Sequence, residues 1–341
     1  MARRRISDVL ARLIVAEFNL IALIRERCAI AREDVRFGIG DDAALLAVPA
    51  GQLLAVSTDT LVAGVHFPQS TKVHDIGWKA LAVNLSDLAA MGATPAWAML
   101  ALTLPEADLH WVGEFADGFA TLAGEFKLAL VGGDTTQGPL SITVTVHGFV
   151  PEGAALLRSG AGIGDAVFVT GTLGDAAAGL RCLDKNDAEA DRLLSAPAGT
   201  REALIERLNR PTPRIAQGLA LRGRASACID VSDGLLADLG HICAASGVGA
   251  ELDAESLPTS SALLTLFDVD ARRAFQLSGG DDYELCFTAA DADASTLLGD
   301  LARSGCGATR IGRIVAESGV RVRDGAGNPV TIARSGWEHF A

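Results

Sequence analysis

Apolar residues follow two periods along this chain, and each period predicts a different kind of element. In residues 140–150, the apolar Ile142, Val144 and Val146 alternate with polar side chains, which is typical of a half-buried strand. In residues 6–28, apolar residues recur three and four positions apart, so we expect one face of a helix there. The chain therefore mixes strands with helices.

The same patterns predict further elements of both kinds. We expect strands at residues 53–57, 97–104, 128–131, 166–170 and 225–230, and helices at residues 75–91, 106–126, 173–183 and 235–245. The helix at 75–91 ends before Gly92. Its Asn84, Asp87 and Leu88 share a face, and because Leu88 is apolar we expect Asp87 to point inward toward a site. The predicted fold class is α/β, with mixed sheets of the α+β type.

A chain of 341 residues is long enough for about two domains. The strongest boundary signal is Pro151-Glu152-Gly153, after which the alternation of strands and helices starts again. We therefore expect an N-terminal α/β domain at residues 17–150 and a C-terminal α/β domain at residues 151–341. Residues 1–16 would be a basic N-terminal arm.

Charge and composition narrow the class of protein. The formal net charge of -13 at pH 7 argues against a nucleic-acid partner. No run of about 18 apolar residues is present, so we expect no membrane span. The six cysteines lack any short Cys/His spacing, which favours buried thiols in a reducing compartment. Charged residues interrupt the apolar stretch after Arg3-Arg4-Arg5, which is not typical of a signal peptide, so we expect a cytoplasmic enzyme.

Candidate chemistry lies in five acidic clusters beside glycines or at the ends of apolar runs. They are Gly40-Asp41-Asp42, Ser57-Thr58-Asp59, Gly133-Asp134-Thr135-Thr136, Asp230-Val231-Ser232-Asp233-Gly234 and Gly279-Gly280-Asp281-Asp282. Taken singly, each could be a turn, a helix cap or a solvated loop. Their repetition in an acidic chain instead favours magnesium ions that bridge carboxylates to a polyphosphate, because hard divalent cations prefer oxygen ligands.

The sequence contains fewer signals for phosphate binding than for metal binding. At residues 230–234 a strand joins a helix, whose N-terminus is a natural seat for a phosphate, although Asp233 could simply cap that helix. The glycines of residues 160–164 precede a strand, so they do not form a dinucleotide-binding loop. No P-loop or protein-kinase motif is present. ATP would then be held by metals, backbone amides and Arg158, and Arg158 could equally be a surface arginine.

Six segments, in order along nearly the whole chain, closely resemble the thiamine-monophosphate kinases of the aminoimidazole ribonucleotide synthetase superfamily. They are Gly38-Ile39-Gly40-Asp41-Asp42, Ser57-Thr58-Asp59-Thr60-Leu61-Val62 with His66-Phe67, residues 79–92, Gly132-Gly133-Asp134-Thr135-Thr136, Asp230-Val231-Ser232-Asp233-Gly234-Leu235 and Ser278-Gly279-Gly280-Asp281-Asp282-Tyr283-Glu284, with Trp337 near the end. The resemblance implies a two-domain fold whose N-terminal domains pair into a barrel-like homodimer.

It also implies the last step of thiamine diphosphate biosynthesis. ATP would phosphorylate thiamine monophosphate to thiamine diphosphate in a magnesium-dependent, direct in-line transfer, without a covalent or strongly basic catalytic residue.

By position, the resemblance implies a set of site residues. The magnesium ligands would be Asp42, Ser57, Thr58, Asp59, Asp87, Asp134, Asp230 and Asp233. The ATP contacts would be Gly133, Asp134, Arg158 and Ser232, and the thiamine phosphate contacts His66, Asp281 and Trp337. The family usually has glutamate where this chain has Asp281, so this carboxylate is one methylene shorter than the pattern.

Two alternatives stay open. The first is a sister enzyme of the superfamily that makes a selenophosphate or an aminoimidazole product, or a hydrogenase-maturation relative. A selenophosphate synthetase would need a reactive cysteine in an N-terminal glycine-rich loop, whereas Cys28 lies on the predicted first helix, and the maturation relative would end in cysteine rather than Ala341. The second is a non-catalytic magnesium–nucleotide sensor, which would not need His66 and Trp337.

Overall fold

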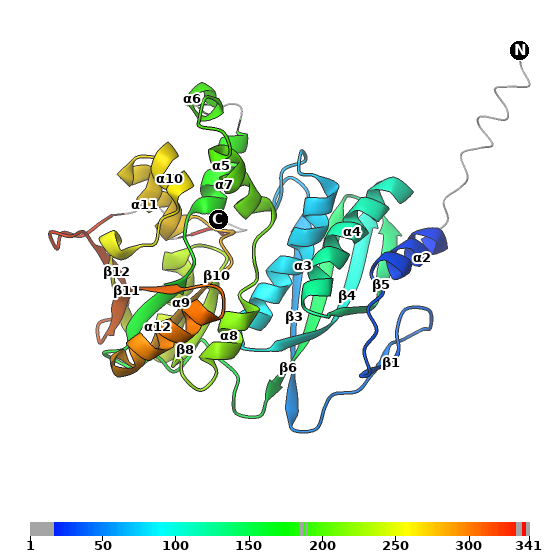
Figure 1. Cartoon of the computed structure of the whole chain (residues 1–341), viewed down its shortest axis with the longest axis horizontal. Helices are drawn as coiled ribbons and strands as arrows, with labels where there is room; N and C mark the ends of the chain where they lie inside the picture. The colour runs from blue at the N-terminus through cyan, green and yellow to red at the C-terminus, as the bar shows by residue number, and fades with distance from the viewer. Residues whose placement is uncertain (1–16, 185–186, 188–189, 332–335, 339–341) are drawn as a thin grey trace, which may run out of the picture. The chain divides into compact units, whose positions relative to one another are not determined.

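The structure is a computed structural model that describes residues 17–184, 187, 190–331 and 336–338 (Figure 1). The expected basic arm at residues 1–16, and the start of the expected helix at 6–28, lie outside the described residues. The described chain forms two compact units. The first comprises residues up to Pro49, Thr58–Asn84 and Pro95–His147, and the second comprises Ala50–Ser57, Leu85–Thr94 and the residues from Gly148 onward.

The first unit is built on a four-stranded sheet with strand order β3-β6-β4-β5, in which β4 and β5 are parallel. A separate antiparallel pair is formed by β1 and β2. The elements are β1 (Val35–Phe37), β2 (Leu45–Leu46), β3 (Gln52–Val62), β4 (Thr94–Leu104), β5 (Ala129–Gln137), β6 (Ser141–Pro151), α2 (Glu17–Arg27), α3 (Val73–Ala90) and α4 (Leu109–Glu125). Of these, residues 52–57 of β3, 85–90 of α3, Thr94 of β4 and 148–151 of β6 fall in the second unit.

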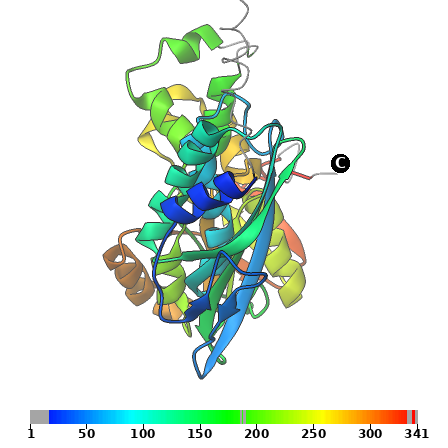
Figure 2. The same ribbon diagram turned by 90° about the vertical axis from the view of Figure 1, so that its right-hand side faces the viewer.

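Helices α3 and α4 lie on one face of this sheet, as the two perpendicular views show (Figures 1 and 2). Helix α4 begins where the side chain of Asp108 accepts hydrogen bonds from the N–H groups of His110 and Trp111. The two helices approach closely, because a Cβ on Gly77 would overlap the carbonyl oxygen of Phe115, and one on Gly118 would overlap that of His74. Glycine at these positions therefore brings the two backbones into contact.

The opposite face of the same sheet carries hydroxyl groups and exposed apolar side chains. The Oγ1 atoms of Thr58 and Thr145 are 2.9 Å apart, and those of Thr60 and Thr143 are 2.8 Å apart, so a ladder of hydroxyl pairs joins β3 to β6. On β4, Met99 is 41% exposed. Helix α2 lies near this face at β4, because its Phe18, Ile21 and Ala22 line a cavity together with Met99.

The second unit is built on a six-stranded mixed sheet with strand order β12-β9-β11-β7-β10-β8, in which β12 and β9 are parallel. Its strands are β7 (Ala166–Thr170), β8 (Ala227–Val231), β9 (Gly249–Asp253), β10 (Glu284–Ala289), β11 (Ala308–Val315) and β12 (Gly319–Arg323). Its helices are α5 (Asp175–Leu183), α6 (Ala190–Leu194), α7 (Thr200–Asn209), α8 (Ile215–Leu221), α9 (Leu235–Ser246), α10 (Ser261–Leu266), α11 (Val269–Ser278) and α12 (Ala294–Arg303), with short 3₁₀ turns at Ala254–Ser256 and Asp291–Asp293.

Apolar residues fix α9 against this sheet. Leu235, Leu239 and Ile242 of α9 are fully buried in one cluster with alternate residues of the strands, such as Val231. On the other face of the sheet, the rings of Phe168 and Phe287 stack with centroids 5.2 Å apart. This packing places the end of β8 and the start of α9 side by side, and the loop between them carries several of the predicted site residues.

The predicted fold class is confirmed, and most predicted elements appear within a few residues of their expected bounds. Two expected strand ends were wrong. The strand predicted at 53–57 does not end at Thr58-Asp59, because β3 continues to Val62. The strand predicted at 128–131 does not end at Gly132-Gly133, because β5 continues through them to Gln137. A Cβ on Gly133 would overlap the carbonyl oxygen of Leu100, so this glycine allows β5 to pass close to β4 rather than turn. The domain bounds 17–150 and 151–341 stay a prediction.

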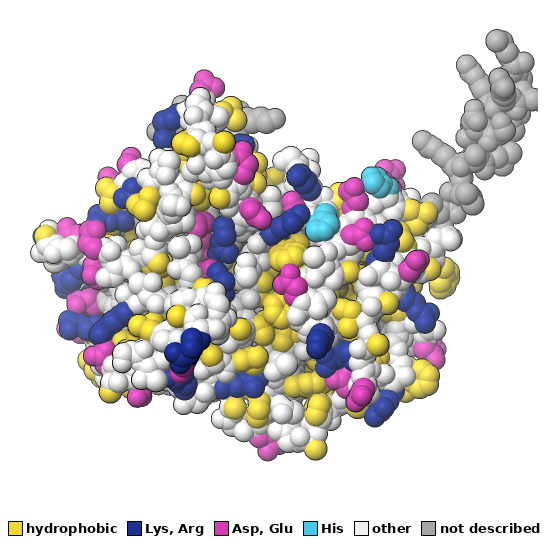
Figure 3. All heavy atoms as spheres, in the orientation of Figure 1, with side chains coloured by type: hydrophobic (Ala, Val, Ile, Leu, Met, Phe, Trp, Pro, Cys, Tyr) yellow, Lys and Arg dark blue, Asp and Glu magenta, His cyan; other side chains and the backbone are white. Residues whose placement is uncertain are grey.

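Surface charge is mixed. On the face shown in Figure 3, Lys and Arg side chains are interspersed with Asp and Glu rather than gathered in a continuous basic patch. Among the described helices, none is long and apolar enough to cross a membrane.

We predict that Gly118→Ala lowers the free energy of unfolding by about 1–3 kcal/mol, because the added methyl group must displace the backbone at His74. Gly124→Ala, in the same helix, is the matched control. No atom would lie within 4 Å of a Cβ added there, so Gly124→Ala should leave stability unchanged or raise it by up to about 1 kcal/mol. Chemical denaturation measures both, and equal stability of the two variants would contradict this account of the α3–α4 contact.

Candidate functional site

A cavity of about 510 Å³ in the second unit contains the polar side chains of Ser57, Asp87, Arg158 and Asp230 in its lining. Apolar side chains, among them Met91, line the rest of it. Asp87 lies near the end of α3 and lines this cavity. This position agrees with the helical pattern, from which we expected Asp87 to face inward. Four residues predicted to bind metal or ATP are therefore brought together here.

Both carboxylates of this cavity accept a hydrogen bond from a serine hydroxyl. Ser57 Oγ donates to Asp87 Oδ2 at 2.5 Å, and Ser86 Oγ donates to Asp230 Oδ2 at 2.7 Å. Ser86 is fully buried and Asp230 is 5% exposed. Hydrogen bonds to an ionised acceptor are short and strong, so these serines fix where the carboxylate oxygens point. A hydroxyl donor carries no charge, so these two hydrogen bonds do not themselves offset the charge of a carboxylate.

The loop that follows β8 is organised by a residue that sequence reasoning did not single out. Asp238 Oδ2 accepts hydrogen bonds from the N–H groups of Ser232, Asp233 and Gly234, at 3.0, 3.1 and 3.0 Å. Burial, together with the charge of nearby Asp233, raises the pKa of Asp238 to about 7. These three N–H groups lie just ahead of α9, which begins at Leu235, so the side chain of Asp238 organises the approach to the helix. The phosphate seat expected at residues 230–234 stays a prediction.

The backbone N–H groups of two further predicted residues donate hydrogen bonds to carbonyl groups of the same loop. The N–H of Asp281 donates to Ser232 O at 2.9 Å, and the N–H of Trp337 donates to Asp233 O at 3.0 Å. Asp281 has a positive φ of 69° and Tyr283 one of 51°, a conformation that non-glycine residues rarely adopt. The hydroxyl of Tyr283 donates to Asp281 Oδ1 at 3.2 Å. Ser232, Asp233, Asp281 and Trp337 therefore belong to one connected backbone network.

The other two acids of the segment 281–284 are buried and structural. Asp282 Oδ2 accepts the N–H of Gly174 at 2.7 Å and so caps α5, and burial raises its pKa well above the usual value. Glu284 is fully buried and accepts hydrogen bonds from Arg207 Nη2 at 2.9 Å and Arg214 Nε at 2.6 Å. The alternative of solvated acids is therefore wrong for these two side chains.

In the first unit, a cavity of about 920 Å³ is lined by the glycine-rich segment from Gly38 to Asp42 and by Gly132 and Gly133. Asp42 is exposed, and so is Asp134, which follows Gly133 on β5. Of the residues predicted in this unit, the structure thus places Asp42 and Gly133 in the wall of one cavity.

Two more predicted residues lie on or just after β3. The hydroxyl of Thr58 donates to Val144 O at 3.1 Å, on the face of β3 opposite to Ser57 and Asp59. In the turn after β3, His66 Nδ1 accepts the N–H of Val62 at 2.9 Å, so Nε2 carries the proton of the neutral ring. The Thr58 side chain therefore does not share a side of the strand with its two neighbours.

The cavity chemistry fits magnesium. Among the described residues, no group of three or more His, Cys, Asp or Glu side chains converges to form a metal site. Magnesium is usually bound through one or two carboxylates, with waters and substrate phosphates completing the shell. Ser57, Asp87 and Asp230 offer such a partial set, made of oxygen donors only.

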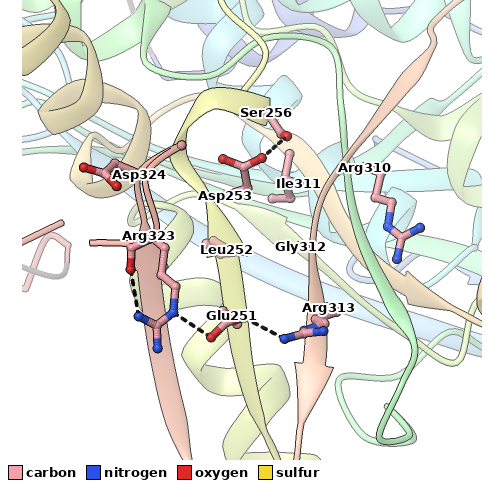
Figure 4. A pocket seen from close by; sticks show the side chains of 12 residues that line it. Glu251, Leu252, Asp253, Ser256, Arg310, Ile311, Gly312, Arg313, Arg323 and Asp324 are labelled. Carbon is pink, nitrogen blue, oxygen red and sulfur yellow. Dashed lines mark hydrogen bonds and ion pairs between the residues drawn. The ribbon is translucent and has the colours of Figure 1, made fainter. Parts of the chain in front are cut away.

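The second unit has a further surface cavity, of about 460 Å³, and none of the predicted site residues lines it (Figure 4). Glu251 lies between two arginines: Oε1 is 2.9 Å from Arg313 Nη2, and Oε2 is 2.8 Å from Arg323 Nε. These contacts hold the pKa of Glu251 below its usual value. Because its central charges pair with one another, this cavity is not a candidate for the predicted chemistry.

The functional residues that sequence reasoning missed are Ser86 and Asp238. Each is a polar residue in a helix that is otherwise largely apolar, which is the signal that could have drawn attention to it. Their partners could not be read from spacing alone, because Ser86 and Asp230 are 144 positions apart.

Two family models match the sequence. The N-terminal domain model of AIR synthase related protein matches residues 40–150, and the corresponding C-terminal domain model matches residues 162–325. Together with the two α/β units, these matches define the class: the chain is similar to AIR synthase related proteins along most of its length.

Individual relatives are more specific. The thiamine-monophosphate kinase of Salmonella typhimurium is 50% identical over 327 residues, which are 95% of this chain and 98% of the relative. The crystal structure of thiamine-monophosphate kinase from Stenotrophomonas maltophilia K279a is 53% identical, covers 90% of this chain and 96% of its own, and has a TM-score of 0.82. The structure of AaThiL complexed with AMPPCP and TMP is 33% identical. It covers 96% of this chain and 97% of its own, with a TM-score of 0.74. This chain belongs to the thiamine-monophosphate kinase family, which confirms the resemblance.

We predict that Glu284→Gln lowers the free energy of unfolding by about 3 kcal/mol or more, because it removes the charge that offsets two partly buried guanidinium groups. Glu251→Gln is the matched control, since Glu251 also pairs with two arginines but at the surface. Thermal and chemical unfolding compare the variants. A loss of stability in Glu284→Gln no larger than in Glu251→Gln would contradict the structural role of Glu284.

Proposed function

We propose that this chain transfers the γ-phosphate of ATP to thiamine monophosphate, giving thiamine diphosphate and ADP, as the last step of thiamine diphosphate biosynthesis. The observation that carries the proposal is the 50% identity to the Salmonella typhimurium kinase over nearly the full length of both chains. AaThiL complexed with AMPPCP and TMP supports an ATP site and a thiamine monophosphate site in the same fold. We place the reaction in the cytoplasm.

Magnesium is the cofactor that the donor set suits. We propose as its ligands Ser57, Asp87, Asp230 and Asp233 in the second unit, and Asp42, Thr58, Asp59 and Asp134 in the first. Because the hydroxyl of Thr58 bonds to Val144 O, the donor we propose for Thr58 is its backbone carbonyl. When bound, magnesium would neutralise charge on the phosphates during transfer.

The nucleotide and the acceptor require different kinds of contact. For ATP we propose Gly133, Asp134, Arg158 and Ser232, of which Arg158 lines the cavity with Asp87 and Asp230. For thiamine monophosphate we propose His66, Asp281 and Trp337. Trp337 is 53% exposed, and an accessible indole face suits the thiazolium cation of thiamine.

The reaction needs no nucleophile from the protein. An oxygen of the acceptor phosphate attacks the γ-phosphorus of ATP, a new phosphorus–oxygen bond forms, and the bond to the β–γ bridging oxygen breaks to release ADP. The attacking phosphate is already ionised near neutral pH, so no strong base is required. The protein contributes by positioning both phosphates in line.

We further propose that two copies of the chain form a homodimer through the open face of the sheet β3-β6-β4-β5. This face combines the threonine ladder with apolar side chains such as Met99, 41% exposed, and Val56, 55% exposed. Asp134 of β5, which pairs with Ala101, is also exposed on this face. Apolar groups mixed with neutral hydroxyls suit a self-complementary contact.

Sedimentation velocity should therefore give about twice the mass of one chain, and Met99→Glu should shift the protein toward the monomer by burying a charge. Leu264→Glu, at a leucine that is 53% exposed on α10, is the control that should stay dimeric. A monomeric wild type, or equal behaviour of the two variants, would rule out this interface.

The activity is tested directly by incubating the purified protein with ATP, thiamine monophosphate and excess magnesium, and following thiamine diphosphate by chromatography. We predict product that disappears when magnesium is chelated. Consumption of ATP without thiamine diphosphate would indicate a sister activity, and binding of ATP without turnover would indicate a sensor.

In the same assay, Asp87→Asn should lower kcat by about 100-fold, the scale of losing one charge-stabilising group. The fold should persist because the amide keeps an oxygen that can accept the Ser57 hydroxyl. Asp253→Asn, at an exposed aspartate of the same unit, is the matched control and should keep wild-type turnover. Normal turnover in Asp87→Asn would remove Asp87 from the metal assignment.

A further inference from the structure

The loop at residues 232–234, between β8 and α9, has a consistent orientation of its backbone groups. Three consecutive N–H groups, of Ser232, Asp233 and Gly234, converge on Oδ2 of Asp238. The carbonyl groups of Ser232 and Asp233 point the other way and accept hydrogen bonds from Asp281 and Trp337. One buried carboxylate therefore determines on which side of the loop its acceptors lie.

We propose that Asp238 is a positioning residue that sets the metal, nucleotide and acceptor groups of the kinase site at once. The inference rests on the proposed function for the roles of Asp233, Ser232, Asp281 and Trp337. Asp238 itself is 3% exposed and lies in the first turn of α9, beneath the loop. It acts through the loop and touches no substrate in this account.

The packing of two glycines shows how closely the neighbouring segments depend on the loop. A Cβ on Gly280 would overlap Ser232 O, and a Cβ on Gly336 would meet Asp233 O and the side chain of Ala237. Each of these glycines precedes a residue proposed to contact thiamine monophosphate, Asp281 or Trp337. A shift of the loop would therefore move both acceptor contacts together.

The same shift would also change metal binding. Asp233 lies within the loop, so this proposed ligand moves with a backbone that Asp238 holds, while Asp230 lies in β8 directly ahead of it. Loss of Asp238 should then weaken metal binding and acceptor binding in parallel. A residue that served only the stability of the core would lower the melting temperature without this paired effect.

Asp165 provides the matched control. Its Oδ2 also accepts a backbone N–H, from Gly162 at 2.8 Å, and a hydroxyl, from Ser226 at 2.6 Å. Ser226 immediately precedes β8, whereas the loop held by Asp238 follows the other end of that strand. Asp165 therefore fixes a turn of the same unit at the opposite end of the same strand.

The test compares Asp238→Ala, Asp238→Asn and Asp165→Ala in the full-length chain. Calorimetry would measure the binding of Mn²⁺ as a magnesium substitute and of thiamine monophosphate, and thermal unfolding would be recorded for each variant. We expect Asp238→Ala to weaken both binding constants at least about tenfold, the scale seen when a residue supporting a metal ligand is removed. Asp238→Asn keeps an oxygen acceptor and should recover most of both losses, while Asp165→Ala should stay within about twofold of wild type.

Unchanged Mn²⁺ and thiamine monophosphate binding in Asp238→Ala would overturn the inference, and so would equal losses in Asp165→Ala. If Asp238→Ala does not fold, the comparison rests on Asp238→Ser against Asp165→Ser, because the shorter serine side chain does not reproduce the carboxylate oxygen that accepts the backbone N–H groups. Indistinguishable Mn²⁺ binding in those two variants would overturn the inference as well. Failure of the kinase assignment gives a different result, because the wild type would then make no thiamine diphosphate and would not bind thiamine monophosphate, whatever the variants do to Mn²⁺.

Discussion

A carboxylate that is removed from water must receive hydrogen bonds, and the choice of donor decides what that carboxylate can do. In the second unit, Asp230 receives a serine hydroxyl, whereas Glu284 receives two guanidinium groups. A hydroxyl fixes the direction of the carboxylate but does not offset its charge. The guanidinium groups offset the charge of Glu284, so that residue serves the fold, whereas the serine hydroxyls on Asp230 and Asp87 fix the direction of those carboxylates in the cavity wall.

The same constraint explains why unusual backbone geometry gathers at one place. Asp281 and Tyr283 both have positive φ, a conformation that costs on the order of 1–3 kcal/mol per residue. The side chains on either side of Tyr283 hold this segment, since Asp282 caps α5 and Glu284 binds Arg207 and Arg214. Buried acids thus secure a strained segment that presents Asp281 toward the loop of Ser232.

The sequence allowed a good prediction of the local elements and of which residues carry chemistry. The strand at 166–170 was predicted with its observed bounds, and the helix at 235–245 to within one residue. The sequence did not predict hydrogen bonds and ion pairs whose partners are far apart along the chain. Glu284 bonds to arginines 70 and 77 positions away. Nor did the sequence predict that the N–H groups of Ser232, Asp233 and Gly234 bond to Asp238. Periodicity gives the face on which a residue lies, but it does not say which donor reaches which carboxylate.

The most direct test of the central claim is a crystal structure of the full chain with magnesium, AMPPCP and thiamine monophosphate. The account predicts carboxylate oxygens of Asp87 and Asp230 at about 2.0–2.1 Å from magnesium, the normal distance for this ion, with Ser86 still bonded to Asp230. Magnesium bound to the phosphates without either carboxylate would contradict it, because the two serine-held acids would then have no part in binding the metal.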